Sequence, residues 1–423
     1  MKYLVFGNGK SIEKKCVFWN MLFSILTSLQ SAVMLLIVTR VNGTEDAGIL
    51  SIAFATAYLM YTIGTYGVRN FQVTDASRQY SYSDYRRVRI ISSIMMIVVS
   101  LFYCVWKHYD SYKASVVLVV CTLKLLESVE DLYHGELQRE GRLDVAGRAG
   151  MIRLIGSYAV FIIVLLLSSN LFIALCASVM SSLLCIIIMR PMVGELFAED
   201  VKNDKWQRFI ELSAACFPLF ITAFLSIYIC NSPKYAIDNC LTEKDQAYYA
   251  IISMPVFTIN LLSGVIYRPK LFHMAKMWAE ENKTMFTKMI MKQTRNIAVI
   301  SGLILFFGLT VGLKLLEILY GVSLDSLKLE FAVLLLGGGV VAIYNFLTAC
   351  ITIMRKQTFL IGLSVFIMVL SWIISDKMVQ YAGLTGAAWL YFILMACEMV
   401  IVLIALFGYL RKANNANCMM EKR

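Results

Sequence analysis

Long apolar runs separated by short polar segments recur from one end of the 423-residue chain to the other. A helix needs roughly 20 mostly apolar residues to cross the hydrocarbon core of a bilayer. The pattern therefore predicts an all-α integral membrane protein with about twelve spanning helices. These are expected at residues 17–39, 47–68, 88–106, 114–134, 151–168, 171–190, 209–230, 247–268, 292–313, 329–354, 358–376 and 383–410.

Composition agrees with a lipid environment. Hydrophobic residues make up 59% of the chain and charged residues 16%, whereas soluble domains hold about 45–50% and about 25%. The net charge of +11 would suggest a nucleic-acid partner in a soluble protein. In a membrane protein, Lys and Arg collect in the cytoplasmic loops instead. No nucleic-acid partner is expected.

The distribution of basic residues predicts the orientation. Of the 39 Lys and Arg, 30 fall in segments on the side of the N-terminus, eight fall in segments on the opposite side, and Lys124 lies inside the fourth span. Because cytoplasmic loops carry the excess of Lys and Arg, both termini are predicted to be cytoplasmic.

The two halves of the chain share a coarse pattern. Each half holds six predicted spans, and the second span of each half ends at a basic residue, Arg69 or Arg268, before a basic and aromatic segment. Six spans plus six in one orientation indicate pseudo-repeats about an axis normal to the membrane. The expected organisation is an N-terminal lobe at 1–190, a cytoplasmic linker at 191–208 and a C-terminal lobe at 209–423 with a short basic tail.

The fourth span carries the densest set of charges in any span: Lys124, Glu127, Glu130, Asp131 and His134. At 3.6 residues per turn, all five lie on about one third of the helix surface. Charges at this depth are costly unless they face a bundle interior or a wet cavity. The stripe is either a structural network near the cytoplasmic interface or the lining of a polar cavity. In the second interpretation Lys124 binds substrate and the other four couple transport to H⁺ or Na⁺.

The outer end of the seventh span has similar ambiguity. Pro233 is expected to break the helix there, with Lys234 and Asp238 one turn apart. Carbonyls freed by proline in a membrane helix need polar partners, which often surround a cavity. Asn231 and Lys234 are therefore candidate substrate ligands and Asp238 a candidate ion-coupling residue, and a structural role is equally open.

Three arginines, Arg69, Arg153 and Arg268, lie at predicted inner helix ends. Their side chains can simply extend to the membrane surface. Alternatively, their guanidinium groups bind an anionic lipid headgroup, because their planar forks fit phosphate oxygens.

Signals for a metal, a cofactor or catalysis are weak. The 11 cysteines and three histidines are scattered and form no CxxC motif. The Gly-Asn-Gly-Lys-Ser segment at 7–11 lacks the first glycine of a phosphate-binding loop, since position 4 is leucine. No nucleophile and base pair is evident, so no cofactor, metal or enzymatic activity is expected.

Four segments, together with the six-plus-six layout, resemble the polysaccharide transporter family, the O-antigen and lipid-linked oligosaccharide flippases of the MOP (MATE-like) superfamily. The resemblance covers essentially the whole chain. The segments are Val41–Ser51, Gly67–Asp75, Gly135–Asp144 and Asn231–Asp238.

This resemblance implies two six-helix lobes that form a V around a central cavity and alternate between inward-open and outward-open states. It implies a substrate, an undecaprenyl-diphosphate-linked oligosaccharide, moved to the outer leaflet of a bacterial cytoplasmic membrane, with glycan-assembly proteins as partners. The alternatives are a cation-coupled small-molecule exporter of the same fold, a membrane polymerase or ligase, and a scaffold or channel. Polymerases and ligases typically carry a large outer loop, and the predicted outer loops are all short.

Overall fold

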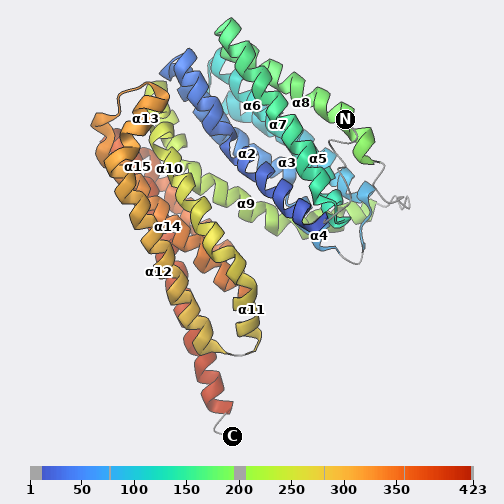
Figure 1. The fold of residues 1–423 in the computed structure, drawn as a ribbon, viewed down its shortest axis with the longest axis vertical. Helices are drawn as coiled ribbons and strands as arrows, with labels where there is room; N and C mark the ends of the chain where they lie inside the picture. The colour runs from blue at the N-terminus through green and yellow to red at the C-terminus, as the bar shows by residue number, and fades with distance from the viewer. Residues whose placement is uncertain (1–11, 76–77, 195–205, 281, 357, 421–423) are drawn as a thin grey trace. The chain divides into compact units, whose positions relative to one another are not determined.

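The computed structural model describes residues 12–75, 78–194, 206–280, 282–356 and 358–420 (Figure 1). Every regular element within these residues is a helix. The all-α class predicted from the apolar runs is therefore confirmed, and the helices follow one another with short connections.

Within the described residues, the first part of the chain forms eight helices. Their bounds are α2 (Ile12–Val41), α3 (Thr44–Thr65), α4 (Val68–Thr74), α5 (Tyr82–Trp106), α6 (Ser111–Arg139), α7 (Leu143–Ser168), α8 (Leu171–Gly194) and α9 (Trp206–Cys240). The part of the second half that the structure describes forms six α-helices. A 3₁₀ turn (Arg268–Lys270) precedes α11, a π-helical turn (Gly308–Gly312) precedes α13, and another 3₁₀ turn (Asp325–Leu327) precedes α14. Their bounds are α10 (Glu243–Tyr267), α11 (Leu271–Ala279), α12 (Lys283–Phe307), α13 (Leu313–Tyr320), α14 (Lys328–Ile353) and α15 (Thr358–Met420).

Ten helical segments of the described chain are long and apolar enough to cross a membrane. The protein is therefore a multi-pass membrane protein. Helix α6 is not among the ten, because its charges lower its hydropathy. Helix α15 counts once although it consists of two helices joined at Gly383, whose φ of 57° and ψ of −135° are not helical. Twelve spans would require α6 and both parts of α15 to cross, so the predicted count and orientation stay predictions.

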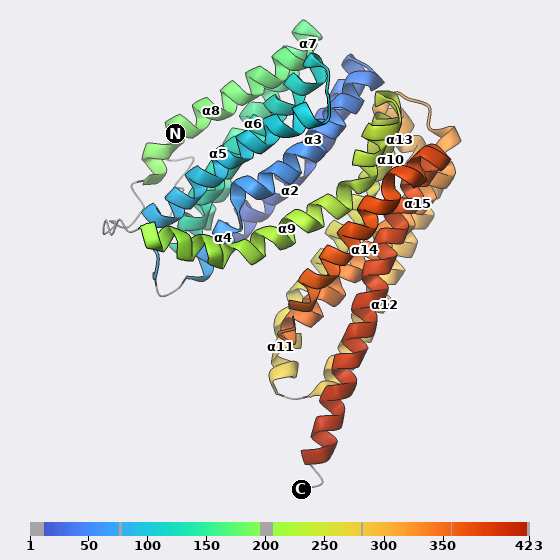
Figure 2. The ribbon, with the colours of Figure 1, turned by 180° about the vertical axis from the view of Figure 1, so that it is seen from behind.

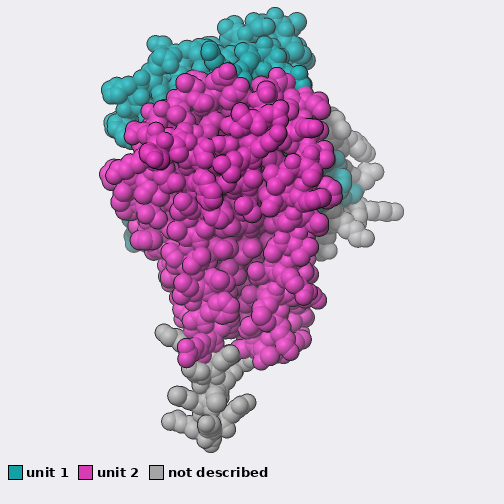
Figure 3. Space-filling model, turned by 90° about the vertical axis from the view of Figure 1, so that its left-hand side faces the viewer, with its two compact units in different colours: residues 1–227 teal, residues 228–423 magenta. Residues whose placement is uncertain are grey.

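The chain divides into two compact units, residues 1–227 and 228–423, which Figure 3 shows in two colours. The division falls inside α9, whereas the sequence predicted a linker at 191–208, of which 195–205 lie outside the described residues. The first turns of α9 belong to unit 1 because Leu212 and Cys216 are fully buried there against α4 and α5.

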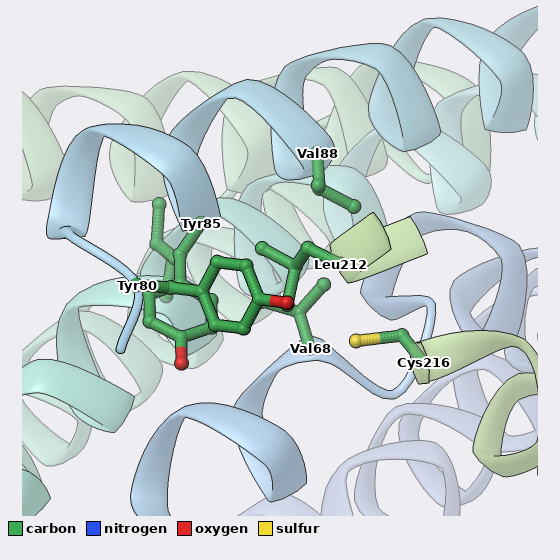
Figure 4. Packing of buried hydrophobic residues seen from close by; sticks show 7 residues of the cluster. Val68, Tyr80, Tyr85, Val88, Leu212 and Cys216 are labelled. Carbon is green, nitrogen blue, oxygen red and sulfur yellow. The ribbon is translucent and has the colours of Figure 1, made fainter. Parts of the chain in front are cut away.

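Figure 4 shows this packing from close by. The side chains of Val68, Tyr80, Tyr85 and Val88 surround Leu212 and Cys216. The segment between α4 and α5 is held by one carboxylate, since Asp75 accepts hydrogen bonds from the backbone N–H groups of Gln79 and Tyr80 and from the Tyr85 hydroxyl. This tie fixes the start of α5 beside α4.

Helix α6 occupies the interior of unit 1. It packs against α3, α5, α7 and α8, and α4 lies across its C-terminal half. The close approach of α3 to α5 and α6 uses Gly64, where a Cβ would meet Met96 and Ser128. The most highly charged helix of the unit is thus surrounded by other helices, as the cost of burying charge in lipid requires.

In unit 2, α14 packs against α10, α12 and α15 (Figure 2). Two glycines allow this close contact. A Cβ at Gly337 would meet the Tyr391 ring of α15, and a Cβ at Gly338 would meet Val256 and Ile259 of α10. Small residues let membrane helices approach closely, so α14 forms the centre of this unit.

The expectation that Pro233 breaks the seventh span is wrong. Helix α9 continues through Pro233 to Cys240. Proline lacks the N–H that would bond the carbonyl four residues earlier, which here belongs to Ile229. The Ser232 hydroxyl donates a hydrogen bond of 3.0 Å to that carbonyl, so the helix loses little on passing the proline.

Candidate functional site

The charged stripe predicted on the fourth span lies in the interior of unit 1, on α6. Lys124, Glu127, Glu130 and His134 are buried, and Asp131 is nearly so. Three further cations from other helices complete what we call the α6 charge cluster. Its members are Lys124, Glu127, Glu130 and Asp131 of α6, Arg69 of α4, Arg89 of α5 and Arg153 of α7.

Lys124 lies at one end of the cluster and is only 1% exposed. Its ammonium group donates to Gln30 Oε1 of α2 at 2.5 Å and to Glu127 Oε2 at 2.7 Å. The same group lies 4.5 Å from the centre of the Tyr58 ring of α3. Three helices thus provide a negative, a polar and an aromatic neighbour, which together replace the water that the lysine loses.

Arg153 occupies the middle of the cluster and is also 1% exposed. Its Nε donates to Glu130 Oε2 at 2.8 Å, and its Nη2 lies 4.0 Å from Glu127 Oε1. Neither terminal nitrogen of the guanidinium group has a hydrogen-bond partner, and neither does Glu127 Oε1. His134 Nε2 lies 3.8 Å from Glu130 Oε1. Arg153 therefore offers two unused donor groups inside the unit.

Asp131 forms the third part of the cluster by bridging two arginines. Arg69 donates to Asp131 Oδ1 and Arg89 donates to Asp131 Oδ2, both at 3.0 Å. Arg69 also donates to Gln138 Oε1 at 3.0 Å, about two turns further along α6. Arg89 also donates to Ser128 Oγ at 3.1 Å and to the carbonyl of Gly64 at 3.0 Å.

The backbone explains how Arg69 reaches α6. Tyr66 and Gly67, between α3 and α4, both have positive φ, at 48° and 67°. This turn lays α4 across the C-terminal half of α6. At the crossing, Gly135 has no side chain, and a Cβ there would meet Gln72 and Arg69. The glycine thus provides the space in which Arg69 lies beside Asp131.

Two cavities open along the cluster. One of about 260 Å³ is lined by Phe23, Ser24, Thr27, Ser28, Tyr61, Arg69, Glu127, Glu130, Asp131, His134 and Arg153. A second of about 440 Å³ is lined by Tyr61, Thr65, Gly67, Arg69, Asn70, Asp131, Gln138, Leu219 and Ala223. Tyr61, Arg69 and Asp131 line both, so the two cavities adjoin. The first is lined by five charged residues, and the second is rich in hydroxyl and amide groups.

The balance of charge in the cluster favours an anionic ligand. It holds four cations and three carboxylates, and each carboxylate lies within 3.0 Å of a cation. The excess of one positive charge, together with the free donors of Arg153, suits the oxygen atoms of a phosphate or diphosphate.

The structure separates the candidate residues predicted from sequence. Arg69, Arg153 and Lys124 meet the four acidic and histidine candidates of α6 in unit 1. The remaining candidates lie in unit 2. They are Asn231, Lys234 and Asp238 on α9 and Arg268 at the end of α10. Arg268 is exposed.

Two features of the site were missed. Arg89 was counted with the basic residues of the cytoplasmic face, yet it is 2% exposed inside unit 1. Its position as the second residue of the predicted third span (88–106), one turn before Ser92 and Ser93, was the available signal. Gln30, the only amide in the first span after its first turn, was also overlooked. Within the described residues, no group of three or more His, Cys, Asp or Glu could hold a metal ion.

Comparison with solved structures defines the class of fold. The lipid II flippase MurJ in an inward closed conformation superposes with a TM-score of 0.71, at 13% identity, over 95% of this chain and 91% of that chain. A Vibrio cholerae MATE transporter, VcmN, superposes with a TM-score of 0.62, at 12% identity, over 95% and 98%. The chain therefore has a MATE-like fold, as the resemblance implied.

The sequence itself identifies the family. Residues 14–268, more than half of the chain, match the polysaccharide biosynthesis protein family, and the chain belongs to that family. A curated relative is the capsular polysaccharide biosynthesis protein CapF of Staphylococcus aureus, which is 24% identical over 301 residues, 70% of this chain and 75% of CapF. The resemblance predicted from the four sequence segments is confirmed.

Proposed function

We propose that this protein is a flippase that moves a lipid-linked glycan across a membrane for cell-surface polysaccharide biosynthesis. The substrate is an undecaprenyl-diphosphate-linked oligosaccharide, and the direction is from the cytoplasmic to the outer leaflet of a bacterial cytoplasmic membrane. Membership of the polysaccharide biosynthesis family and the MATE-like fold support the proposal. Its structural basis is the buried guanidinium of Arg153 beside a cavity.

The physical problem for such a substrate is its diphosphate. Removing a phosphate group from water without a replacement for its hydration is prohibitively costly. The two free terminal nitrogens of Arg153 and the neighbouring Arg69 line one cavity. They supply fixed donors and positive charge for the diphosphate oxygens. The adjoining cavity offers hydroxyl and amide groups for sugar, through Thr65, Asn70 and Gln138.

A cation-coupled drug exporter is the second candidate, because three carboxylates of α6 line or border the cavity. An exporter of cations would need carboxylates whose charge is available to the substrate. Here Glu127, Glu130 and Asp131 are each bound to a cation of the protein. This pairing favours the flippase.

Alternating access supplies the movement, and a gradient of H⁺ or Na⁺ supplies its direction. The acidic residues of α6 and Asp238 of α9 were the first candidates for that coupling. Proteins that assemble the glycan on either side of the membrane are the expected partners.

The proposal is tested by reconstituting the purified protein in proteoliposomes with a fluorescent polyprenyl-diphosphate-linked oligosaccharide. Flipping is measured as the fraction accessible to an external lectin or quencher. A charge-assisted hydrogen bond is worth about 1.5–3 kcal/mol, so Arg153→Gln should lower flipping about 10- to 100-fold. Arg153→Lys, which keeps the charge but loses the fork, should fall in between. Lys276→Gln, at an exposed ion pair of α11, serves as the control and should match wild type.

Loss of folding must be separated from loss of binding. Arg153→Gln leaves Glu130 without its cation, so the double variant Arg153→Gln with Glu130→Gln is compared as well. The pair keeps a hydrogen bond and removes both charges. A folded double variant that flips normally would show that the guanidinium does not bind substrate. Wild-type protein that flips no glycan but exports cationic dyes would favour the second candidate.

A further inference from the structure

A single carboxylate lies buried in unit 2 with none of the partners seen in unit 1. Glu398 belongs to the second part of α15, after Gly383 (red in Figure 2), and is 4% exposed. It shares a helix face with Leu394, Met395 and Val402, all at most 1% exposed. The apolar face of α15 is thus interrupted by one acidic group.

The groups around Glu398 are neutral acids and not bases. Its carboxyl interacts electrostatically with the Cys230 thiol of α9, the Tyr344 hydroxyl of α14 and the Tyr391 hydroxyl of α15 itself. Tyr249 of α10 interacts in turn with Cys230 and Tyr391. Among the described residues, Glu398 has no ion pair and no hydrogen bond.

The nearest basic residue along α9 is Lys234, one turn beyond Cys230. It forms no ion pair with Glu398. An unpaired carboxylate in an apolar interior is far less stable than the neutral acid. Burial without a partner therefore favours the neutral acid at Glu398.

The carboxylates of the α6 charge cluster differ from Glu398 in having cationic partners. Glu127, Glu130 and Asp131 each lie within 3.0 Å of a lysine or arginine. A neighbouring cation stabilises the charged form of a carboxylate. These three carboxylates, the first candidates from the sequence for ion coupling, are each held by a cation of the protein, whereas Glu398 is not.

We propose that Glu398 is the proton-binding carboxyl of this transporter, neutral when enclosed by α9, α14 and α15 and ionised when water reaches it in another conformation. The carboxyl releases H⁺ to water, leaves a carboxylate, and takes up H⁺ before it is enclosed again. Cys230 of α9, whose thiol interacts electrostatically with the carboxyl, is exposed. Coupling of this proton to glycan movement rests on the proposed flippase function, whereas proton binding itself does not.

Proton binding is tested first, without substrate. Dicyclohexylcarbodiimide is an apolar reagent that reacts with a protonated carboxyl group in an apolar site. The O–H of the carboxyl adds across a C=N bond of the reagent. The purified full-length protein is treated over a pH series, digested and analysed by mass spectrometry. The peptide with Glu398 should be labelled at acid pH and lose the label as pH rises, with about a tenth remaining one pH unit above the midpoint.

The expected label is absent in Glu398→Gln, which keeps the size of the side chain. An infrared difference spectrum gives a second readout that does not depend on reagent access. The carbonyl band of a protonated carboxylic acid should disappear with rising pH in wild type and be missing in the variant. No labelling and no such band at any pH would overturn the proposal.

Coupling is tested in proteoliposomes with an imposed pH gradient. Wild type should flip lipid-linked glycan faster with the gradient than without it. Glu398→Gln should lose this stimulation, and its flipping should no longer vary with pH. A variant that keeps the full stimulation would overturn the coupling role. If wild type flips no glycan, the proposed function fails, and the labelling experiment still decides whether Glu398 binds a proton.

Discussion

Asp131 is the most sensitive position of the α6 charge cluster, because one carboxylate neutralises two arginines. Asp131→Asn removes both ion pairs and keeps one hydrogen-bond acceptor. Arg89 is 2% exposed, so its charge would remain buried with only Ser128 and a backbone carbonyl as partners. Arg69 is 28% exposed and can turn toward water, so losing its ion pair should destabilise the protein less.

The size of the effect follows from this geometry. Leaving one charge of a buried pair without its partner costs about 3–5 kcal/mol, and the two remaining hydrogen bonds of Arg89 place the change near the lower limit, at about 3 kcal/mol. For a unit of this size, 1 kcal/mol changes Tm by about 2–4 °C. The variant should therefore unfold about 6–12 °C below wild type in a thermal-shift assay in detergent.

Asp325→Asn provides a matched control. Asp325 forms an ion pair of 3.0 Å with Lys328, and both side chains are about two thirds exposed. Exposed pairs contribute at most about 1 kcal/mol, so this variant should unfold within about 2–4 °C of wild type. The double variant Asp131→Asn with Arg89→Gln should lose about 1–3 kcal/mol less than the sum of the single variants. Strict additivity, or equal Tm values for the two Asp→Asn variants, would refute the interpretation of Asp131 as a buried bridge.

Two further predictions concern backbone features of the helices. Gly383→Ala places a side chain at φ 57° and ψ −135° and should cost about 1–3 kcal/mol, measured as a lower Tm. Gly302→Ala, in α12 with open space around it, is the control and should be neutral or stabilising. Equal Tm values for the two variants would contradict backbone strain at Gly383. Ser232→Ala leaves the Ile229 carbonyl without its donor and should lower the free energy of unfolding by about 1–3 kcal/mol. Adding Pro233→Ala, which restores a backbone N–H, should recover most of that stability. No recovery would show that the hydrogen bond from the hydroxyl does not stabilise the helix.

Much of the fold could be predicted because the apolar runs are long. The predicted span at 151–168 corresponds to α7 (Leu143–Ser168), and that at 171–190 corresponds to α8 (Leu171–Gly194). The errors lie at the helix ends, which extend beyond the apolar core by a turn or two. In residues 143–150, Asp144, Arg148 and two glycines lower the hydropathy, so the apolar run predicts a later start than the helix has.

The candidate site was predictable only in part. Helical periodicity placed the α6 charges on one face, and they do share the interior of unit 1. Periodicity cannot show which other helices supply the partners, so Arg89 was read as a surface residue and its bond to Asp131 was not foreseen. Glu398 was overlooked for the opposite reason. A single acid forms no pattern, although it is the only acidic residue of the predicted span at 383–410.

Helix α9 has a consequence for how the protein is made. Its first turns supply Leu212 and Cys216 to the buried cluster of unit 1, yet they are synthesised after all the other helices of that unit. Domains generally fold from the N-terminus as the chain emerges. The first six long helices therefore enter the membrane with an open groove beside α4 and α5. Unit 1 closes only when the ribosome has delivered α9, and the same helix then begins unit 2.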